Sequence, residues 1–198
     1  MRSASSPGRQ ETIRSSPGFS LVELLIVVGI LLVLSAFAFP TVTRSIRTYR
    51  LSGAATNVSS MLQLTRFEAV RLNRSNPPLS WRSQLQGGQS VFWVDVNNNG
   101  ALDSTEPQAR FSLEMQFLPA GTAPSVTSMG YASTQISPAA ISFDSRGTVS
   151  FGVAPPVVYV LVLGYANQPA EGYRAVTVTP SGKTQMWSAG ADGVWQKR

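Results

Sequence analysis

The 198-residue sequence contains neither cysteine nor histidine. Without cysteine, the chain has no disulfide and no thiol chemistry. Histidine is the commonest general base and the commonest metal ligand of proteins, so its absence excludes a Ser-His-Asp triad, a Cys-His pair and a histidine zinc site. Aspartate, glutamate, lysine and tyrosine are the remaining acid-base groups. We therefore expect a protein that is not an enzyme.

Charged residues are also scarce. They make up 13% of the chain, against roughly 25% in typical soluble proteins, whereas hydrophobic residues make up 43%. Part of this imbalance comes from residues 19–39, an apolar run with a single charged residue, Glu23. A helix of this length spans a bilayer. The formal net charge is +6, a mild excess that favours weak attraction to polyanions without identifying one.

Two processing schemes fit the amino-terminal region. Residues 1–17, rich in Ser, Arg and Pro, precede the apolar run and are predicted to be a cytoplasmic leader. A conventional signal peptide is cut after its apolar region at a small-x-small site, which residues 36–38 (Ala-Phe-Ala) provide, and this cut releases a soluble protein that begins at Phe39. The alternative is cleavage ahead of the run, between Gly18 and Phe19, which leaves the apolar helix on the mature chain.

Residues 18–23 (Gly-Phe-Ser-Leu-Val-Glu), followed by the apolar run and by Pro40, closely resemble the amino terminus of the prepilin family. This resemblance implies that prepilin peptidase cuts between Gly18 and Phe19 and methylates the new terminal amine of Phe19. It also implies a single-pass protein of the bacterial inner membrane with a periplasmic carboxy-terminal domain. Such a protein assembles with other pilins or pseudopilins into an extracytoplasmic filament. Basic residues flank the run on both sides, so the predicted orientation depends on the resemblance rather than on charge.

Glu23 is the one charged group in the apolar run, where an ionised carboxylate is costly unless it is paired. The run contains no cation, whereas cleavage creates one at the amine of Phe19. The resemblance implies that the amine of a neighbouring subunit pairs with this carboxylate and sets the register of the filament. The alternative is that Glu23 lies at the lipid headgroup boundary and has no role in assembly.

A second helical pattern follows Pro40, a residue that usually kinks or interrupts a helix. Apolar residues recur at three- and four-residue steps as far as Leu72, with polar residues between them. We therefore predict a long helix over residues 19–72 that spans the membrane at about 19–39. Residues 73–78, which include two consecutive prolines, end this helix.

From residue 79 onward, short alternating segments are separated by turns rich in Gly, Pro and Asn. This pattern indicates antiparallel strands packed as a sandwich. The predicted strands are residues 90–94, 109–117, 140–143, 148–151, 157–163, 174–178 and 184–187. The predicted fold is α+β: a long amino-terminal helix, membrane-spanning in its first half, packed on an antiparallel β-sandwich-like globular domain of residues 73–198. Residues 1–18 are expected to be removed as the leader.

Three segments of the chain resemble the GspH/FimT-like pilins. They are a helix end at residues 66–73 (Arg-Phe-Glu-Ala-Val-Arg-Leu-Asn) and two hairpins, at 141–148 (Ile-Ser-Phe-Asp-Ser-Arg-Gly-Thr) and 176–183 (Val-Thr-Val-Thr-Pro-Ser-Gly-Lys). The resemblance implies a minor pilin of a type IV pilus or a minor pseudopilin of a type II secretion system, present in low copy. Both machines share every one of these features.

Residues 95–106 (Asp-Val-Asn-Asn-Asn-Gly-Ala-Leu-Asp-Ser-Thr-Glu) match the twelve-residue calcium-loop pattern at every defined position. Calcium takes oxygen ligands, which six residues would supply, Ala101 through its carbonyl. These are Asp95, Asn97, Asn99, Ala101, Asp103 and Glu106. The flanking segments read as strands rather than the helices of an EF-hand, and an Asn-Gly turn between apolar runs is also a hairpin signal. Both a calcium site and a plain hairpin turn fit this segment, and no other cofactor is expected.

Some minor pilins of the GspH/FimT-like family bind DNA during uptake through an arginine-bearing motif near the carboxy terminus. Here four cations lie near Trp187 and Trp195: Arg174, Lys183, Lys197 and Arg198. Cations interleaved with aromatic rings can hold single strands by charge and stacking. The family's Gly-Arg-x-Arg arrangement is absent, however, and the tryptophans also fit the core of a hairpin edge. A filament-borne binding protein, for DNA uptake in competence or for surface adhesion, is therefore the alternative to a purely structural subunit.

Overall fold

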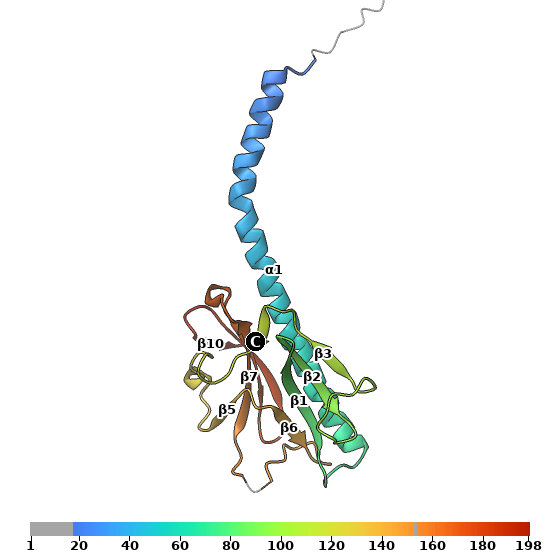
Figure 1. The fold of residues 1–198 in the computed structure, drawn as a ribbon. Helices are drawn as coiled ribbons and strands as arrows, with labels where there is room; N and C mark the ends of the chain where they lie inside the picture. Colours follow the sequence, from blue (N-terminus) through green and yellow to red (C-terminus); the bar gives the residue numbers. More distant parts are fainter. Residues whose placement is uncertain (1–17, 153) are drawn as a thin grey trace, which may run out of the picture. The chain divides into compact units, whose positions relative to one another are not determined.

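The computed structural model describes residues 18–152 and 154–198, so the predicted leader lies, apart from Gly18, outside the described residues. The chain divides into two units, Met1–Val42 and Thr43–Arg198, and each is described by itself. Helix α1 (Leu21–Arg71) contributes residues to both units (Figure 1).

In the first unit, α1 is apolar on every side. Its large apolar side chains from Leu21 to Phe39 are all exposed. Among the described residues, α1 is the one helix long and apolar enough to cross a membrane, judged by length and composition. The backbone stays helical through Pro40, so the interruption that this proline suggested is absent. A proline removes one hydrogen bond from a helix, and the turns on both sides continue here.

In the second unit, α1 is buried along one face only. The buried residues recur every three or four positions, which matches the helical repeat: Leu51, Ala55, Val58, Leu62, Thr65 and Ala69. The helix ends at Arg71 because Asn73 adopts a left-handed φ of 49° and the Arg74 N–H donates to the Ala69 carbonyl at 2.9 Å. Asparagine thus takes the place that glycine usually has in this type of helix cap.

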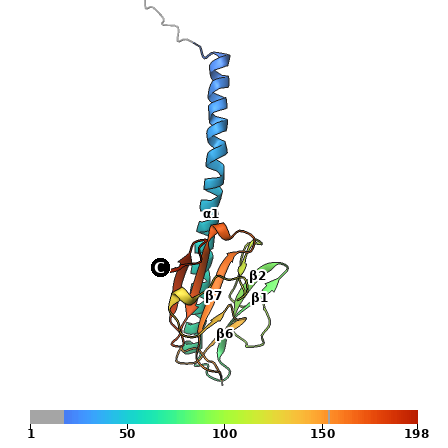
Figure 2. The same ribbon diagram turned by 90° about the vertical axis from the view of Figure 1, so that its left-hand side faces the viewer.

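Two sheets surround the buried face of α1 (Figures 1 and 2). The first has the order β3 (Gln108–Arg110), β2 (Gln89–Asp95), β1 (Leu79–Gln86), β6 (Ala140–Phe143). The second has the order β10 (Trp195–Lys197), β9 (Thr184–Ala189), β8 (Tyr173–Val178), β7 (Val158–Tyr165), β4 (Met115–Phe117). All these pairings are antiparallel, and a further strand, β5 (Thr134–Ile136), pairs with β7 in parallel. The predicted α+β class is confirmed. Two short 3-10 helices, η1 (Thr127–Met129) and η2 (Pro169–Glu171), complete the fold.

The main core lies where α1 and both sheets meet. It contains the buried stripe of α1, Trp81 and Phe92 of the first sheet, and Leu161 and Val176 of the second. Aromatic contacts also join the sheets directly, since the rings of Trp81 and Phe117 meet edge to face with centroids 5.7 Å apart. Such pairs contribute beyond the area that they bury, about 0.5–1.5 kcal/mol each.

A second core covers the other face of the larger sheet. Val160, Val162 and Ala175 point to this face, and Trp187 and Trp195 pack with them. The segment of residues 118–136 supplies the covering side chains, among them Leu118 and Met129. The larger sheet is therefore buried on both faces, which explains the continuous apolar sequence of β7.

Several strand predictions need correction. The predicted strand 109–117 is two strands in different sheets, β3 and β4, because the chain turns at residues 111–114 and the Met115 N–H donates to the Ser112 carbonyl. The predicted strand 148–151 forms a single bridge, since the Val149 N–H donates to the Pro180 carbonyl instead. Strands β1, β5 and β10 were not predicted. Strand β1 is polar over most of its length, and the other two have three residues each.

The three segments that resemble GspH/FimT-like pilins converge at one point in the second unit. Arg66 of α1 donates from Nε to the carbonyl of Gly147 at 2.8 Å. Gly147 and Gly182 both adopt left-handed backbones, with φ of 74° and 77°. A Cβ on Gly182 would lie 2.1 Å from the Gly147 carbonyl oxygen and 3.0 Å from Arg66 Nε. The two turns therefore lie so close together that position 182 has no room for a side chain.

Replacing Gly182 by alanine should destabilise the protein by about 2–4 kcal/mol, because it adds a steric collision to the left-handed strain. The matched control is Gly87→Ala, where φ is +58° but nothing lies within 4 Å, so only the strain of about 1 kcal/mol remains. Thermal unfolding of the full chain in nonionic detergent measures both. Equal losses of stability in the two variants would contradict the close approach of the turns.

Candidate functional site

The predicted processing site lies at the beginning of the described chain. Gly18 and Phe19 precede α1 and are outside regular secondary structure, and the Phe19 side chain is 74% exposed. Glu23 lies in the first turn of α1, where the helix dipole favours a negative charge. Within the described residues, no cation forms an ion pair with Glu23. The peptide bond and the carboxylate that the prepilin resemblance singles out are thus both accessible in the isolated chain.

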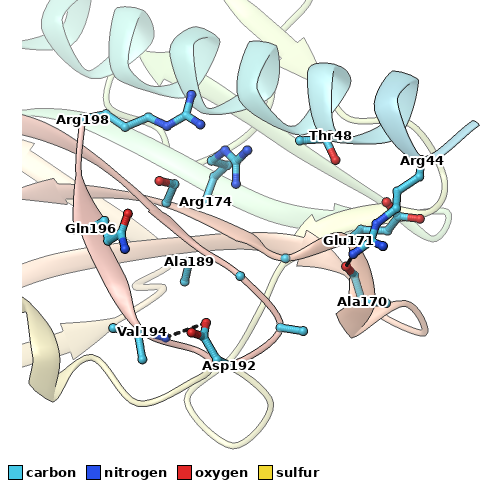
Figure 3. Close-up of a pocket in the computed structure, with 14 residues that line it drawn as sticks. Arg44, Thr48, Ala170, Glu171, Arg174, Ala189, Asp192, Val194, Gln196 and Arg198 are labelled. Carbon is cyan, nitrogen blue, oxygen red and sulfur yellow. Dashed lines mark hydrogen bonds between the residues drawn. The ribbon is translucent and has the colours of Figure 1, made fainter. Parts of the chain in front are cut away.

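A basic pocket of about 420 Å³ lies in the second unit, between α1 and the ends of β8, β9 and β10 (Figure 3). Arg44 reaches it from α1, Arg174 from β8 and Arg198 from the residue after β10. Glu171 and Asp192 are its two acidic residues. Three arginines in one pocket are a candidate site for an anion.

Arg174 is the unusual group of this pocket because it is a buried cation, 7% exposed. Its Nε donates to Ser52 Oγ at 3.1 Å and its Nη1 donates to the Tyr173 carbonyl at 2.9 Å. No carboxylate of the described chain lies within ion-pair distance of it. Burial lowers the pKa of Arg174 below its usual value, and the charge of Arg198 lowers it further. An anion would relieve both effects.

The two acidic residues of the pocket, Glu171 and Asp192, interact with groups other than Arg174. Glu171 Oε1 lies 3.6 Å from Arg47 Nη1. Asp192 Oδ1 accepts a hydrogen bond from the Val194 N–H at 3.2 Å, and Arg44 Nη2 donates to the Ala170 carbonyl at 2.7 Å. Neither acidic group of the pocket therefore forms an ion pair with Arg174.

The structure brings together only part of the predicted nucleic-acid site. Arg174 and Arg198 share the basic pocket, joined by Arg44, which the sequence analysis did not assign. Lys183 lines a separate hollow beside Arg66. Lys197 lies between two pocket residues, Gln196 of β10 and Arg198 directly after this strand, so strand alternation directs it to the opposite face. No sequence signal links Arg44 to the carboxy terminus, because their proximity arises from tertiary packing.

The two tryptophans near these cations are core residues and are not exposed stacking platforms. Trp187 and Trp195 are buried in the second core. Trp187 Nε1 donates to Thr177 Oγ1 at 3.1 Å, and Trp195 Nε1 donates to the Ser125 carbonyl at 2.9 Å. Both tryptophans are therefore core side chains, as the hairpin-edge interpretation expected, and neither presents an exposed ring face.

The predicted calcium loop joins β2 to β3. Asp95, the last residue of β2, is fully buried, and its carboxylate accepts from the N–H groups of Asn99 and Gly100 at 3.0 Å each. Asp95 Oδ2 also accepts from Arg82 Nε at 2.6 Å. Asp103 Oδ2 accepts from the side-chain amide of Asn97 at 2.6 Å and from that of Asn99 at 2.9 Å.

The end of this loop is Glu106, which is 6% exposed. Its Oε1 accepts from the N–H groups of Val96 and Asn97 at 2.8 and 3.4 Å. The carboxylate thus folds back over the first residues of the loop. Ala101 donates its N–H to Asn99 Oδ1 at 2.8 Å and is exposed. Among the described residues, no three Asp, Glu, His or Cys side chains form a compact metal cluster.

Comparison with known proteins supplies two family matches. Residues 54–182 match the family described as type II transport protein GspH, which is more than half of the chain. Residues 13–39 match the prokaryotic N-terminal methylation motif. A search of curated proteins and a search of solved structures each found no match.

The two matches cover the amino-terminal processing site, the apolar run and most of the globular unit. The methylation motif contains the bond between Gly18 and Phe19, Glu23 and the apolar run. The GspH match contains both sheets except β9 and β10, and it includes the convergence of Arg66, Gly147 and Gly182. The chain therefore belongs to the GspH family and is a pilin-like protein of type II secretion systems or type IV pili.

Proposed function

We propose that this protein is a low-copy structural subunit of an extracytoplasmic filament and that it joins the filament through its apolar amino-terminal helix. The observation that carries the proposal is Glu23, a lone carboxylate in the first turn of a helix whose large apolar side chains are exposed on every side. A helix that is apolar all round needs a nonaqueous surrounding. A bilayer provides it before assembly, and a bundle of like helices provides it afterwards.

In such a surrounding the Glu23 carboxylate needs a cation, because an unpaired buried charge costs several kcal/mol. Cleavage between Gly18 and Phe19 would create one, the amine of Phe19. Pairing between this amine and the carboxylate of a neighbouring subunit would satisfy both charges. Since each helix has one such carboxylate, the pair would also fix the axial position of one subunit against the next.

We further propose a location for each part of the chain. Prepilin peptidase removes residues 1–18 on the cytoplasmic side and methylates Phe19, and residues 19–39 span the bacterial inner membrane once. The globular unit is periplasmic before assembly. The methylation-motif match over residues 13–39 supports this arrangement. We expect no enzymatic activity, in keeping with the structural role of the family.

Replacing Glu23 by glutamine should lower the amount of the protein in the filament fraction at least tenfold, while the membrane pool remains. The variant keeps the shape of the side chain and removes its charge, and losing one member of a desolvated pair costs more than the 1.4 kcal/mol that corresponds to a factor of about ten. Quantitative immunoblots of sheared filaments and membranes measure the two pools.

The matched control is Glu68→Gln on the same helix. Glu68 pairs with Arg71 at 2.6 Å in the globular unit, and its loss should leave incorporation unchanged. Mass spectrometry should find N-methylated Phe19 at the mature amino terminus of the native protein and both variants. A mature chain that begins at Phe39 would refute the anchored subunit, and normal incorporation of Glu23→Gln would refute the pairing.

The basic pocket favours a second candidate function, a filament-borne protein that binds DNA. Arg174 is a buried cation without a carboxylate partner, and Arg44 and Arg198 lie in the same pocket. Because Trp187 and Trp195 are buried, such binding would depend on phosphate contacts rather than on stacking. It would therefore show little sequence preference and a steep dependence on salt.

Gel shifts with single- and double-stranded oligonucleotides, at about 50 and about 200 mM salt, test this second function. Replacing Arg44 and Arg198 together by glutamine should weaken binding and reduce the slope of log affinity against log salt by about 2, one unit for each lost phosphate contact. Lys183→Gln, outside the basic pocket, is the control and should bind as the native protein does. An equal loss in both variants would show that the pocket is not the binding site.

A further inference from the structure

Outside the basic pocket, Glu106 is a buried acidic residue with an unsatisfied oxygen. Its Oε2 is buried and has no hydrogen-bond partner. One other carboxylate oxygen in the described chain is in this state, Glu171 Oε2, but that group has Arg47 as its ion partner. Glu106 has no ion pair with any described residue. A buried carboxylate with an open oxygen and no cation is costly, so the position points to a missing positive ligand.

We propose that residues 95–106 bind one calcium ion, with Glu106 as the ligand that closes the site. The Glu106 carboxylate is held over the start of the loop by the N–H groups of Val96 and Asn97, which both donate to Oε1. Oε2, which is buried and has no hydrogen-bond partner, is the oxygen that would bind the ion. The proposal is independent of the filament role and of the basic pocket.

The loop supplies further oxygen atoms with open lone pairs. Within the part of the chain that the structure describes, Asn97 Oδ1 accepts one hydrogen bond, from the Asn99 N–H at 3.0 Å, and Asn99 Oδ1 accepts one, from the Ala101 N–H at 2.8 Å. An amide oxygen has two lone pairs, so each keeps one for an ion. Asp103 Oδ2 accepts hydrogen bonds from the side-chain nitrogens of the same two asparagines, which brings its carboxylate beside their side chains.

Arg82 has a supporting role in this arrangement. Its Nε and the Gly100 N–H both donate to Asp95 Oδ2, whereas Oδ1 accepts only the Asn99 N–H. The arginine therefore binds Asp95 through Oδ2, and Oδ1 keeps acceptor capacity beyond its bond from the Asn99 N–H. Three carboxylates and one arginine give the loop a net charge of about −2, which a divalent cation would balance.

The donor set selects the class of ion. It contains only carboxylate, amide and carbonyl oxygens, which suit hard cations, and the sequence has no histidine or cysteine for softer metals. Magnesium demands a regular octahedron and keeps several waters, whereas calcium accepts the irregular geometry of a loop. Since the carboxylates do not form a compact cluster beforehand, binding has to draw the loop inward, and we expect a Kd of about 10⁻⁴–10⁻³ M, the range of extracellular modules.

Thermal unfolding of the full chain in nonionic detergent, with calcium, magnesium or potassium chloride at matched ionic strength, tests the proposal. Calcium at about ten times its Kd should raise the Tm by about 3–5 °C, and magnesium should raise it by less than half as much. Titration calorimetry should give one site per chain. The absence of a calcium-dependent rise, or an equal rise with potassium chloride, would overturn the proposal.

Two variants locate the site. Glu106→Gln should abolish the calcium-dependent rise in Tm. Asp103→Asn, at a partly exposed position, should weaken calcium binding at least fivefold, and it provides the test if Glu106→Gln folds poorly. The matched control is Asp144→Asn in another acidic turn, where Arg146 N–H, Thr148 N–H and Thr148 Oγ1 already occupy the carboxylate. This control should keep the native response to calcium. A rise that survives both loop substitutions would place any calcium elsewhere and refute the site.

Discussion

The buried stripe of α1 from Leu51 to Ala69 is the contact on which the globular unit depends. The two sheets share no hydrogen-bonded strand pair, so neither can hold the other through a backbone ladder. Both instead pack apolar side chains onto this one helical face, and the aromatic contact of Trp81 with Phe117 adds a direct link. Removing the helix would expose one face of each sheet at once. The helix therefore belongs to the core of the globular unit and is more than a tether to it.

This dependence has a consequence for the first half of α1. The helix that supplies the buried stripe of the core is the same helix that carries the apolar run. The two halves follow different rules of burial. Residues 21–39 are apolar on all sides and suit a bilayer or a bundle, whereas the later half has one apolar face and suits a globular core. A change of surrounding for the first half need not disturb the contacts of the second.

Local patterns in the sequence predicted the features that depend on neighbouring residues. The apolar run, the single carboxylate at Glu23 and the helical repeat up to Leu72 are of this kind, and the observed helix ends at Arg71. Strand β6 was predicted with its observed bounds because its alternation is regular, Ile141 and Phe143 being buried. Strand β1 was missed because only its first three residues are fully buried, while the polar remainder pairs with β2 across the Gly87-Gly88 turn.

The candidate sites also differ in how far the sequence could predict them. The calcium loop is contiguous, so all six of its predicted ligands could be named from the sequence. The basic pocket joins residues more than 120 positions apart, and half of the predicted cations, Lys183 and Lys197, lie outside it. Burial of Trp187 and Trp195 could not be deduced either, since a second core on the outer face of the larger sheet depends on the segment that covers it. Spacing along the chain reveals a site only where one loop or one helix face contains it.

Arg174 and Glu106 are two buried charged residues that the apolar packing of the globular unit does not explain. Each is a buried charged group whose hydrogen bonds are incomplete or whose counter-charge is missing, and they have opposite signs. A structural subunit that needed only a stable core would be expected to replace both with apolar residues, because buried charges without partners weaken a fold. The two proposed ligands, an anion at Arg174 and a divalent cation at Glu106, would supply the missing counter-charges.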